Sequence, residues 1–183
     1  MKIFYKDIEL DILDQVYEPR EDSILLADQL NVKKGMNVLD IGTGCGIQAI
    51  VSAKQGASVV ATDINPNAIE CAKQNAEKNN VEIEFRQGDL FEPITEKFDL
   101  IIFNAPYLKE ESAPAEKQPI DDSYAGAGKI NEFLEQYKNY LKPDGSALLV
   151  YSSLSGIEVT GEIIATKKVA FEEIFVIKLN ARN

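Results

Sequence analysis

The segment FNAPYL, residues 103–108, places polar groups directly after an apolar run. Asn104 carries an amide whose carbonyl oxygen accepts hydrogen bonds, and the backbone carbonyl of Ala105 is a second acceptor. Pro106 removes a competing backbone donor and fixes φ, while Tyr107 adds a flat ring. Taken alone, these four residues would more often form a turn than a site. At the end of a strand that meets a ligand, however, they could hold a planar amino group by its two N–H bonds.

A glycine-rich segment, LDIGTGCGIQA, is the second stretch with chemical potential. Gly42, Gly44 and Gly46 follow an apolar run and precede a helical segment. Glycine allows a tight turn and a close approach of the backbone to a ligand. The dinucleotide fingerprint is G-x-G-x-x-G, whereas the spacing here is G-x-G-x-G, which speaks against a nicotinamide oxidoreductase. Asp40, just before the loop, would repel a pyrophosphate but would suit a cationic ligand.

Three acidic residues follow three consecutive apolar runs: Asp40, Asp63 and Asp89. Each alone would more often be a helix cap or a turn residue, but the carboxyl ends of parallel strands share one edge of a sheet. We expect Asp63, with Ile64 beside it, to bind the ribose hydroxyls of a nucleoside. Asp89 is expected to accept from the adenine amino group, with Leu90 beside the ring. S-adenosylmethionine (SAM) combines these groups with an ammonium and a sulfonium, so the sequence predicts a SAM site.

The elements that must position these residues alternate between strand and helix. Strands are expected at residues 37–42, 59–64, 83–90, 98–104 and 146–153, and helices at residues 19–30, 66–80 and 130–142 and after the glycine loop. Two β segments at 162–169 and 172–179 are expected to form an antiparallel C-terminal edge. Right-handed crossovers then give an α/β fold with a doubly wound, mostly parallel, Rossmann-like seven-stranded sheet.

Length and charge limit the function classes. The chain has 183 residues, 45% of them hydrophobic, which suits a single domain spanning residues 1–183. No apolar run reaches the roughly 18 residues of a membrane helix, and the N-terminus does not resemble a signal peptide, so we expect a cytoplasmic protein without a membrane partner. Thirty acidic and nineteen basic residues give a net charge of −11. This charge disfavours nucleic acid and suits a basic protein partner or a cationic cofactor.

The chain contains two cysteines, Cys45 and Cys71, and no histidine. Missing histidine excludes Ser-His and Cys-His catalysis and the commonest general base near neutral pH. Two thiols without histidine make a poor metal site, so no metal is expected. Both cysteines are expected to be small buried hydrophobic residues.

Two motifs together resemble the HemK-like SAM-dependent N-methyltransferases. The segment VYEPREDSILLADQL, residues 16–30, is similar to the family's Tyr-Glu-Pro-x-Glu-Asp-Ser/Thr segment, and NAPY, residues 104–107, is similar to its Asn-Pro-Pro-Tyr. The resemblance covers most of residues 16–155. Ala105 stands in place of the first proline, and AGAGK, residues 125–129, only loosely matches a glycine-rich segment of the family. Because little chain precedes the first expected strand, the compact archaeal and eukaryotic branch is the most similar.

The resemblance implies the reaction and its partners. Members of this branch methylate the glutamine of a Gly-Gly-Gln motif in a class I translation release factor, and eukaryotic members work with a small zinc-containing activator subunit. In this interpretation, Asn104 and the Ala105 carbonyl accept the two N–H bonds of the glutamine amide, and Tyr107 stacks on it. Pro106 stiffens the loop. The carbonyl acceptor is kept when alanine replaces proline, because every residue has one.

The resemblance also gives residues 1–30 a role as an N-terminal extension that closes over the cofactor site. Tyr17, Ser23 and Asn104 are then expected to contact the cofactor. Two alternatives stay open at this point. The same loop chemistry would suit an exocyclic base amine such as adenine N6 in DNA or RNA, and the altered motif would suit a non-catalytic SAM-binding subunit.

Overall fold

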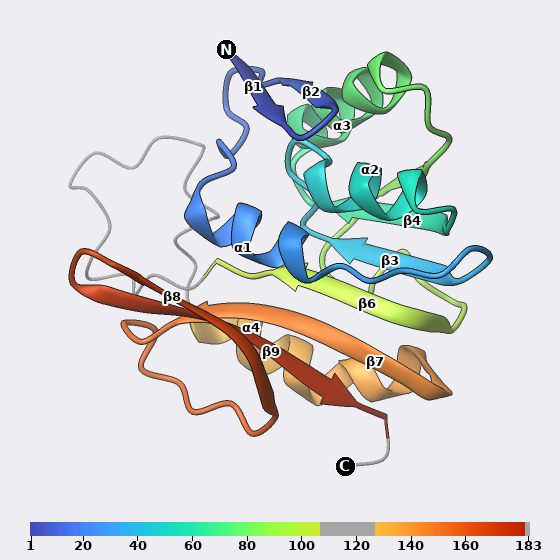
Figure 1. The fold of residues 1–183 in the computed structure, drawn as a ribbon. Helices are drawn as coiled ribbons and strands as arrows, with labels where there is room; N and C mark the ends of the chain where they lie inside the picture. Colours follow the sequence, from blue (N-terminus) through green and yellow to red (C-terminus); the bar gives the residue numbers. More distant parts are fainter. Residues whose placement is uncertain (107–126, 182–183) are drawn as a thin grey trace.

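A seven-stranded sheet forms the centre of the molecule (Figure 1). The structure is a computed structural model and describes residues 1–106 and 127–181. Five strands run parallel in the order β5 (Glu84–Gln87), β4 (Ser58–Asp63), β3 (Asn37–Ile41), β6 (Phe98–Asn104) and β7 (Leu141–Ser152). β9 (Glu172–Asn180) is antiparallel to β7, and β8 (Glu162–Val169) is antiparallel to β9. The expected doubly wound sheet with an antiparallel edge is therefore confirmed.

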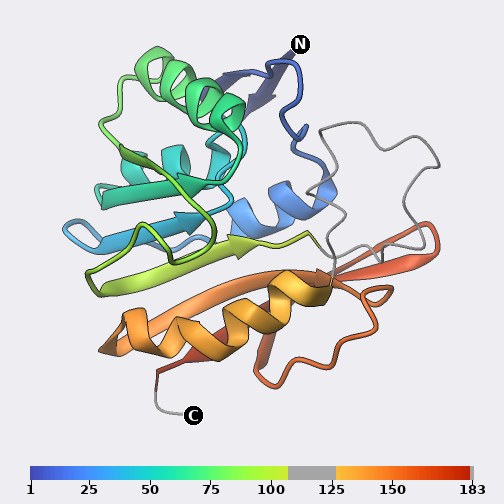
Figure 2. The same cartoon turned by 180° about the vertical axis from the view of Figure 1, so that it is seen from behind.

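Helices cover both faces of the sheet (Figures 1 and 2). One face carries α1 (Glu21–Gln29), α2 (Ile47–Lys54) and α3 (Pro66–Lys78), and the other carries α4 (Ala127–Gln136) and the 3-10 turn η3 (Tyr137–Tyr140). Successive side chains of a strand point to opposite faces. On β6, Leu100 and Ile102 belong to the core under α1, whereas Ile101 and Phe103 belong to the core under α4. The same alternation directs Asn104, the last residue of β6, toward α1.

An N-terminal β-hairpin, β1 (Lys2–Tyr5) with β2 (Ile8–Asp11), was not predicted, although the alternating sequence was its signal. It packs on α3, where Asn75 Oδ1 accepts the backbone N–H of Asp11 and Asn79 Oδ1 accepts that of Glu9. Within residues 1–30, Asp22 and Ser23 of α1 contact Asn104 at the end of β6.

The boundary between α4 and β7 differs from the expected one. The helix expected at 130–142 ends at Gln136, and β7 begins at Leu141 rather than at residue 146. The sequence KPDG, residues 142–145, lies before the expected strand and occupies an irregularity of the β6–β7 pairing. Gly145 sits there, where an added Cβ would lie 2.9 Å from the Phe98 carbonyl oxygen. Turn-forming residues thus make a bulge within a continuous strand.

The C-terminal strands match their expected ranges closely, and the described residues 153–161 connect β7 to β8 without a helix. Cys45 and Cys71 are both buried and free, as expected. None of the helices in the described part of the chain is long and apolar enough to span a membrane.

Candidate active site

The glycine loop joins β3 to α2 at the carboxyl edge of the sheet. Gly42, Gly44 and Gly46 have φ angles of 63°, 55° and 88°, a region that side-chain-bearing residues rarely adopt. The Gly44 N–H donates to Asp63 Oδ2 at 2.9 Å, and the Thr43 N–H donates to the Thr62 carbonyl at 2.9 Å. Both bonds fix the loop against the end of β4.

Gly46 and Gly44 provide a matched test of this loop. A Cβ at Gly46 would lie 3.1 Å from the Ala72 Cβ, whereas a Cβ at Gly44 would meet no atom within 4 Å. In both alanine variants, the left-handed backbone conformation should lower the free energy of unfolding by about 1–2 kcal/mol. In Gly46→Ala, overpacking against Ala72 should lower it by about 1–3 kcal/mol more. Denaturant unfolding measures both losses. Equal losses would show that the contact with Ala72 does not limit this position.

Asp40 lies beneath the glycine loop and is only 1% exposed. Its Oδ2 accepts the Thr43 hydroxyl at 2.7 Å. Burial raises the pKa of Asp40 to about 7, although hydrogen bonds from Thr43 and the Ala49 backbone act in the opposite direction, and the charge of Asp63 raises it further. The carboxylate is therefore poised to change its charge near neutral pH.

Asp63 ends β4 with both carboxylate oxygens toward backbone amides. Oδ2 accepts from Gly44, and Oδ1 accepts the Asn65 N–H at 2.9 Å. Ile64, the next residue, is 47% exposed. Asn65 caps α3 by accepting the Asn67 N–H. The side chains of Asp63 and Asn65 therefore both stabilise the turn between β4 and α3.

Asp89 follows β5 and makes a contact that was not foreseen. Its Oδ2 pairs with Lys129 Nζ at 2.5 Å, and Lys129 also contacts Glu132 at 3.0 Å. Leu90 has φ 44° and is 6% exposed, and its side chain packs in the core under α4 with Phe91. At this position the side chain of Leu90 is directed into the core, and Asp89 faces a lysine of α4.

Asn104 ends β6 with its amide held in one orientation. Its Nδ2 donates to Ser23 Oγ at 3.0 Å and to Asp22 Oδ2 at 3.3 Å. Its Oδ1 is buried and has no hydrogen-bond partner among the described residues. Buried acceptors are rarely left unpaired in native structures. The Nδ2 group of Asn104 is therefore fixed by two hydrogen bonds, whereas its Oδ1 is a buried acceptor that a ligand could satisfy.

Asp22 is the residue that sequence reasoning missed. It is 3% exposed, and its carboxylate also accepts the Tyr17 hydroxyl at 3.0 Å and the Ser23 backbone N–H at 2.6 Å. Gln48 of α2 extends the network, because its Nε2 donates to the Ser23 carbonyl at 2.8 Å. An acid in the first turn of a helix is usually a solvated helix-end group, which is why the sequence alone gave it no special weight.

The other residues of the NAPY motif are only partly described. Ala105 is buried and Pro106 is half-buried. Tyr107 lies outside the described residues. In the AGAGK segment, residues 125–126 also lie outside them, and residues 127–129 form the start of α4. Within the described ranges, no group of three His, Cys, Asp or Glu side chains is placed to hold a metal ion.

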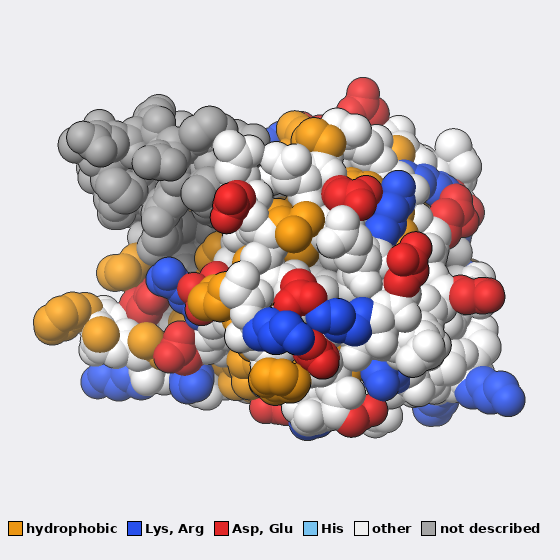
Figure 3. All heavy atoms as spheres, turned by 90° about the horizontal axis from the view of Figure 1, so that it is seen from above, with side chains coloured by type: hydrophobic (Ala, Val, Ile, Leu, Met, Phe, Trp, Pro, Cys, Tyr) orange, Lys and Arg blue, Asp and Glu red, His pale blue; other side chains and the backbone are white. Residues whose placement is uncertain are grey.

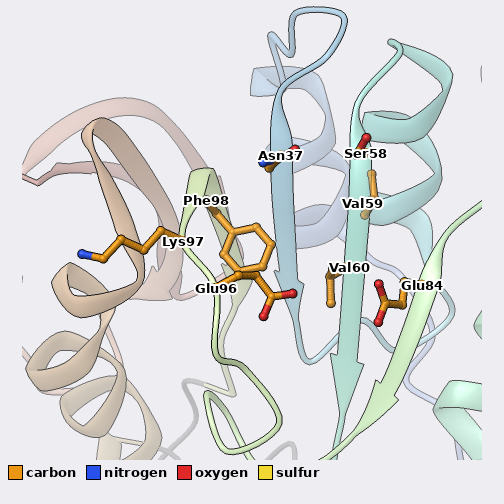
Figure 4. A pocket seen from close by; sticks show the side chains of 8 residues that line it. All are labelled: Asn37, Ser58, Val59, Val60, Glu84, Glu96, Lys97 and Phe98. Atoms are coloured by element: carbon orange, nitrogen blue, oxygen red, sulfur yellow. The ribbon is translucent and has the colours of Figure 1, made fainter.

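A pocket at the opposite end of the strands is separate from this site (Figure 4). It is lined by Asn37, Ser58, Val59, Val60, Glu84, Glu96, Lys97 and Phe98. Arg86 pairs with Glu84 at 2.8 Å and with Glu96 at 2.6 Å, and this pairing lowers the pKa of Glu96 to about 2. Arg86 is thus a shared counter-ion for the two acidic groups of the pocket.

The chain matches the family described as "Methyltransferase small domain" over residues 20–177. It is 42% identical, over 97% of its own length and 98% of the relative's, to a Methanocaldococcus jannaschii protein named "Putative protein N5-glutamine methyltransferase". It is also 38% identical to the "Release factor glutamine methyltransferase" of Lactococcus lactis, over 57% of this chain and 40% of that protein.

Solved structures share the fold. A methyltransferase from Pyrococcus furiosus superposes with a TM-score of 0.68 at 19% identity, covering 95% of this chain and 89% of that one. A 16S rRNA methyltransferase from T. thermophilus gives a TM-score of 0.66 at 20% identity, covering 98% and 50%. The family match and the full-length relative confirm the sequence interpretation: the chain belongs to the methyltransferase small domain family and is a SAM-dependent methyltransferase.

Proposed function

We propose that this protein methylates the side-chain nitrogen of the glutamine in the Gly-Gly-Gln motif of a class I translation release factor. The observation that carries the proposal is the buried, unpaired Oδ1 of Asn104 at the end of β6. A primary amide has two N–H donors and can satisfy this acceptor. The relatives named as glutamine methyltransferases support the same substrate.

The residues present fit SAM. The left-handed glycine loop leaves open space at Gly44, where an added Cβ would meet nothing within 4 Å. Asp40 and Asp63 give the site a negative field that favours a cation. We assign Asp63 and Ile64 to the nucleoside, with Tyr17, Ser23, Asp89 and the Leu90 backbone completing the site. When bound, SAM supplies an electrophilic methyl group.

The chain's own contribution is to hold the acceptor nitrogen. An amide nitrogen is a poor nucleophile because its lone pair is delocalised into the carbonyl. Asn104 Oδ1 would accept one N–H and the Ala105 carbonyl the other, so both acceptors stabilise the positive charge that grows on nitrogen. No base is needed before the transfer, because the positively charged N-methyl amide that forms is strongly acidic and releases its proton to water, which suits a chain without histidine. Positioning of this kind can supply about 7–11 kcal/mol.

Asp22 and Ser23 act as positioning residues for the clamp formed by Asn104 and Ala105. They bind both hydrogens of Nδ2, so the amide cannot rotate and Oδ1 keeps its direction. Tyr17 ties the preceding segment to the same carboxylate. We propose that this segment, rather than the whole of residues 1–30, covers the cofactor.

Labelled SAM and a release factor test the glutamine assignment. The wild-type factor should be labelled, and a factor whose Gly-Gly-Gln glutamine is replaced by alanine should not, because no other primary amide is presented to the clamp. Repeating the reaction with and without a small zinc-containing subunit tests the proposed activator. Equal labelling of the two factors would remove the glutamine assignment while leaving methyltransferase activity in place.

The alternatives receive less support. On the face seen in Figure 3, acidic and basic side chains of the described residues are interspersed, which does not suit a phosphate backbone. The full-length relative is named for a protein substrate. The exocyclic-base and non-catalytic interpretations are therefore not favoured.

A further inference from the structure

Phe171 lies in the turn between β8 and β9 and is 97% exposed. The turn is at the same end of the sheet as the carboxyl end of β6 (Figures 1 and 2). Asn104 pairs with Val150, which pairs with Val176 on β9. Phe171 is five residues beyond Val176, which is about 17 Å along the strand, and β9 is two strand spacings, about 10 Å, from β6. The ring is therefore roughly 20 Å from the clamp.

Leu154 forms a second exposed apolar group next to this turn and is 47% exposed. The Ser153 N–H donates to the Glu173 carbonyl at 2.9 Å, and the Glu173 N–H donates to Ser153 Oγ at 3.0 Å. These two bonds hold the segment after β7 against the start of β9. Leu154 and Phe171 together are called the apolar ridge below.

Exposed large hydrophobic side chains are concentrated at this end of the molecule. Of the seven in the described part of the chain, four lie at the carboxyl edge: Tyr17, Ile64, Leu154 and Phe171. The first two are assigned to the cofactor site. The apolar ridge is not assigned to the cofactor site, and covering its Phe171 ring, which is almost fully exposed, would be favourable for a partner.

The turn itself is built against the usual preferences. Val169 pairs with Glu172, so Ala170 and Phe171 are the two central residues of a two-residue hairpin loop. Such loops favour Asn-Gly or other residues that accept positive φ, yet Ala170 adopts φ 49° and is followed by a solvent-exposed ring. The β1–β2 turn has a similar φ of 52° at Lys6, so the nearly complete exposure of the Phe171 ring, rather than the backbone conformation, distinguishes the β8–β9 turn.

We propose that the apolar ridge docks the folded body of the protein substrate while its glutamine enters the clamp, an inference that rests on the proposed function. A peptide with about three residues on either side of a glutamine reaches only about 10 Å, so it cannot touch a ridge roughly 20 Å away. A folded protein can. The occupant would present an apolar recess. The charges on the hairpin beside the ridge are balanced, with Lys167 and Lys168 next to Glu172 and Glu173, which suits a protein surface better than a phosphate backbone.

Steady-state methylation of a whole release factor and of the short Gly-Gly-Gln peptide tests the proposal. The double variant Leu154→Ser with Phe171→Ser should lower kcat/KM for the factor by about 10-fold or more, as expected when a buried phenylalanine contact is lost. Activity on the peptide and SAM affinity should not change. Phe171→Leu should retain most of the activity on the factor. Phe4→Ser is the matched control, because Phe4 is 70% exposed but lies on the hairpin over α3.

The other outcomes separate the claims. Unchanged kcat/KM for the factor, or equal losses for factor and peptide, would overturn docking at the ridge. Sedimentation that shows a wild-type dimer and a monomeric double variant would assign the ridge to a second copy and would also overturn it. Failure of the wild-type enzyme to methylate either substrate would instead count against the proposed function.

Discussion

Replacing Asn104 with alanine is expected to lower kcat by about 100- to 1,000-fold, the loss typical of removing one stabilising group for a developing charge. Asn104 Oδ1 is the buried, unpaired acceptor at the end of β6 that is assigned to the substrate N–H. Cofactor binding should be largely retained, because the glycine loop and Asp63 are untouched. Single-turnover methyl transfer and calorimetry with SAM separate the two effects.

The Asn104→Ala variant should also keep its stability. The substitution removes an unpaired buried oxygen, whose desolvation costs about 1–3 kcal/mol, together with the Nδ2 bonds to Ser23 and Asp22. These effects oppose each other, so the unfolding midpoint should move little. Ser23→Ala removes only one of the two hydrogen bonds that hold the Asn104 amide, so its kcat should fall less than that of Asn104→Ala. An Asn104→Ala enzyme with wild-type kcat would show that the clamp is not where the charge develops.

Asp40→Asn is expected to stabilise the cofactor-free protein above neutral pH. Burial raises the pKa of Asp40 from 3.8 to about 7, so the folded state binds this proton more tightly than the unfolded state. That stabilisation is complete below about pH 4 and is lost as pH rises through 7, a change of roughly 4 kcal/mol. Unfolding measured at pH 5 and pH 8 should show the wild type losing stability relative to Asp40→Asn. Parallel pH profiles would contradict a buried, titrating Asp40.

The same substitution should weaken the cofactor complex. A cationic ligand favours the charged form of Asp40, so SAM affinity of the wild type should fall as pH drops below about 7. Asp40→Asn should bind SAM more weakly at pH 8 and with less pH dependence. Calorimetry across this range measures both. A variant that binds SAM as tightly as the wild type at pH 8 would remove Asp40 from the electrostatics of the site.

Strand periodicity explains why so much of the fold followed from the sequence. Leu100, Ile101, Ile102 and Phe103 are apolar on both faces, which is typical of a central parallel strand, and β6 has the expected bounds. The glycine spacing likewise located the loop before α2. The N-terminal hairpin was missed although its sequence alternates, because a hairpin of two short strands is stable only where it packs on another element, here α3.

Long-range polar contacts explain what was missed at the site. Asp22 meets Asn104 across 82 positions of sequence, and Lys129 meets Asp89 across 40. Neither partner can be chosen from spacing, because topology alone brings them together. The unpaired Oδ1 of Asn104 is equally invisible in a sequence, since it is defined by the partners that the fold does not provide.

Mass-spectrometric localisation of the methyl group on a release factor treated with the enzyme and SAM tests the central claim most directly. The proposed clamp predicts one added methyl on the side-chain nitrogen of the Gly-Gly-Gln glutamine, and none there with Asn104→Ala. A methyl group on another residue, or an unmodified glutamine under conditions where the enzyme consumes SAM on nucleic acid, would contradict it.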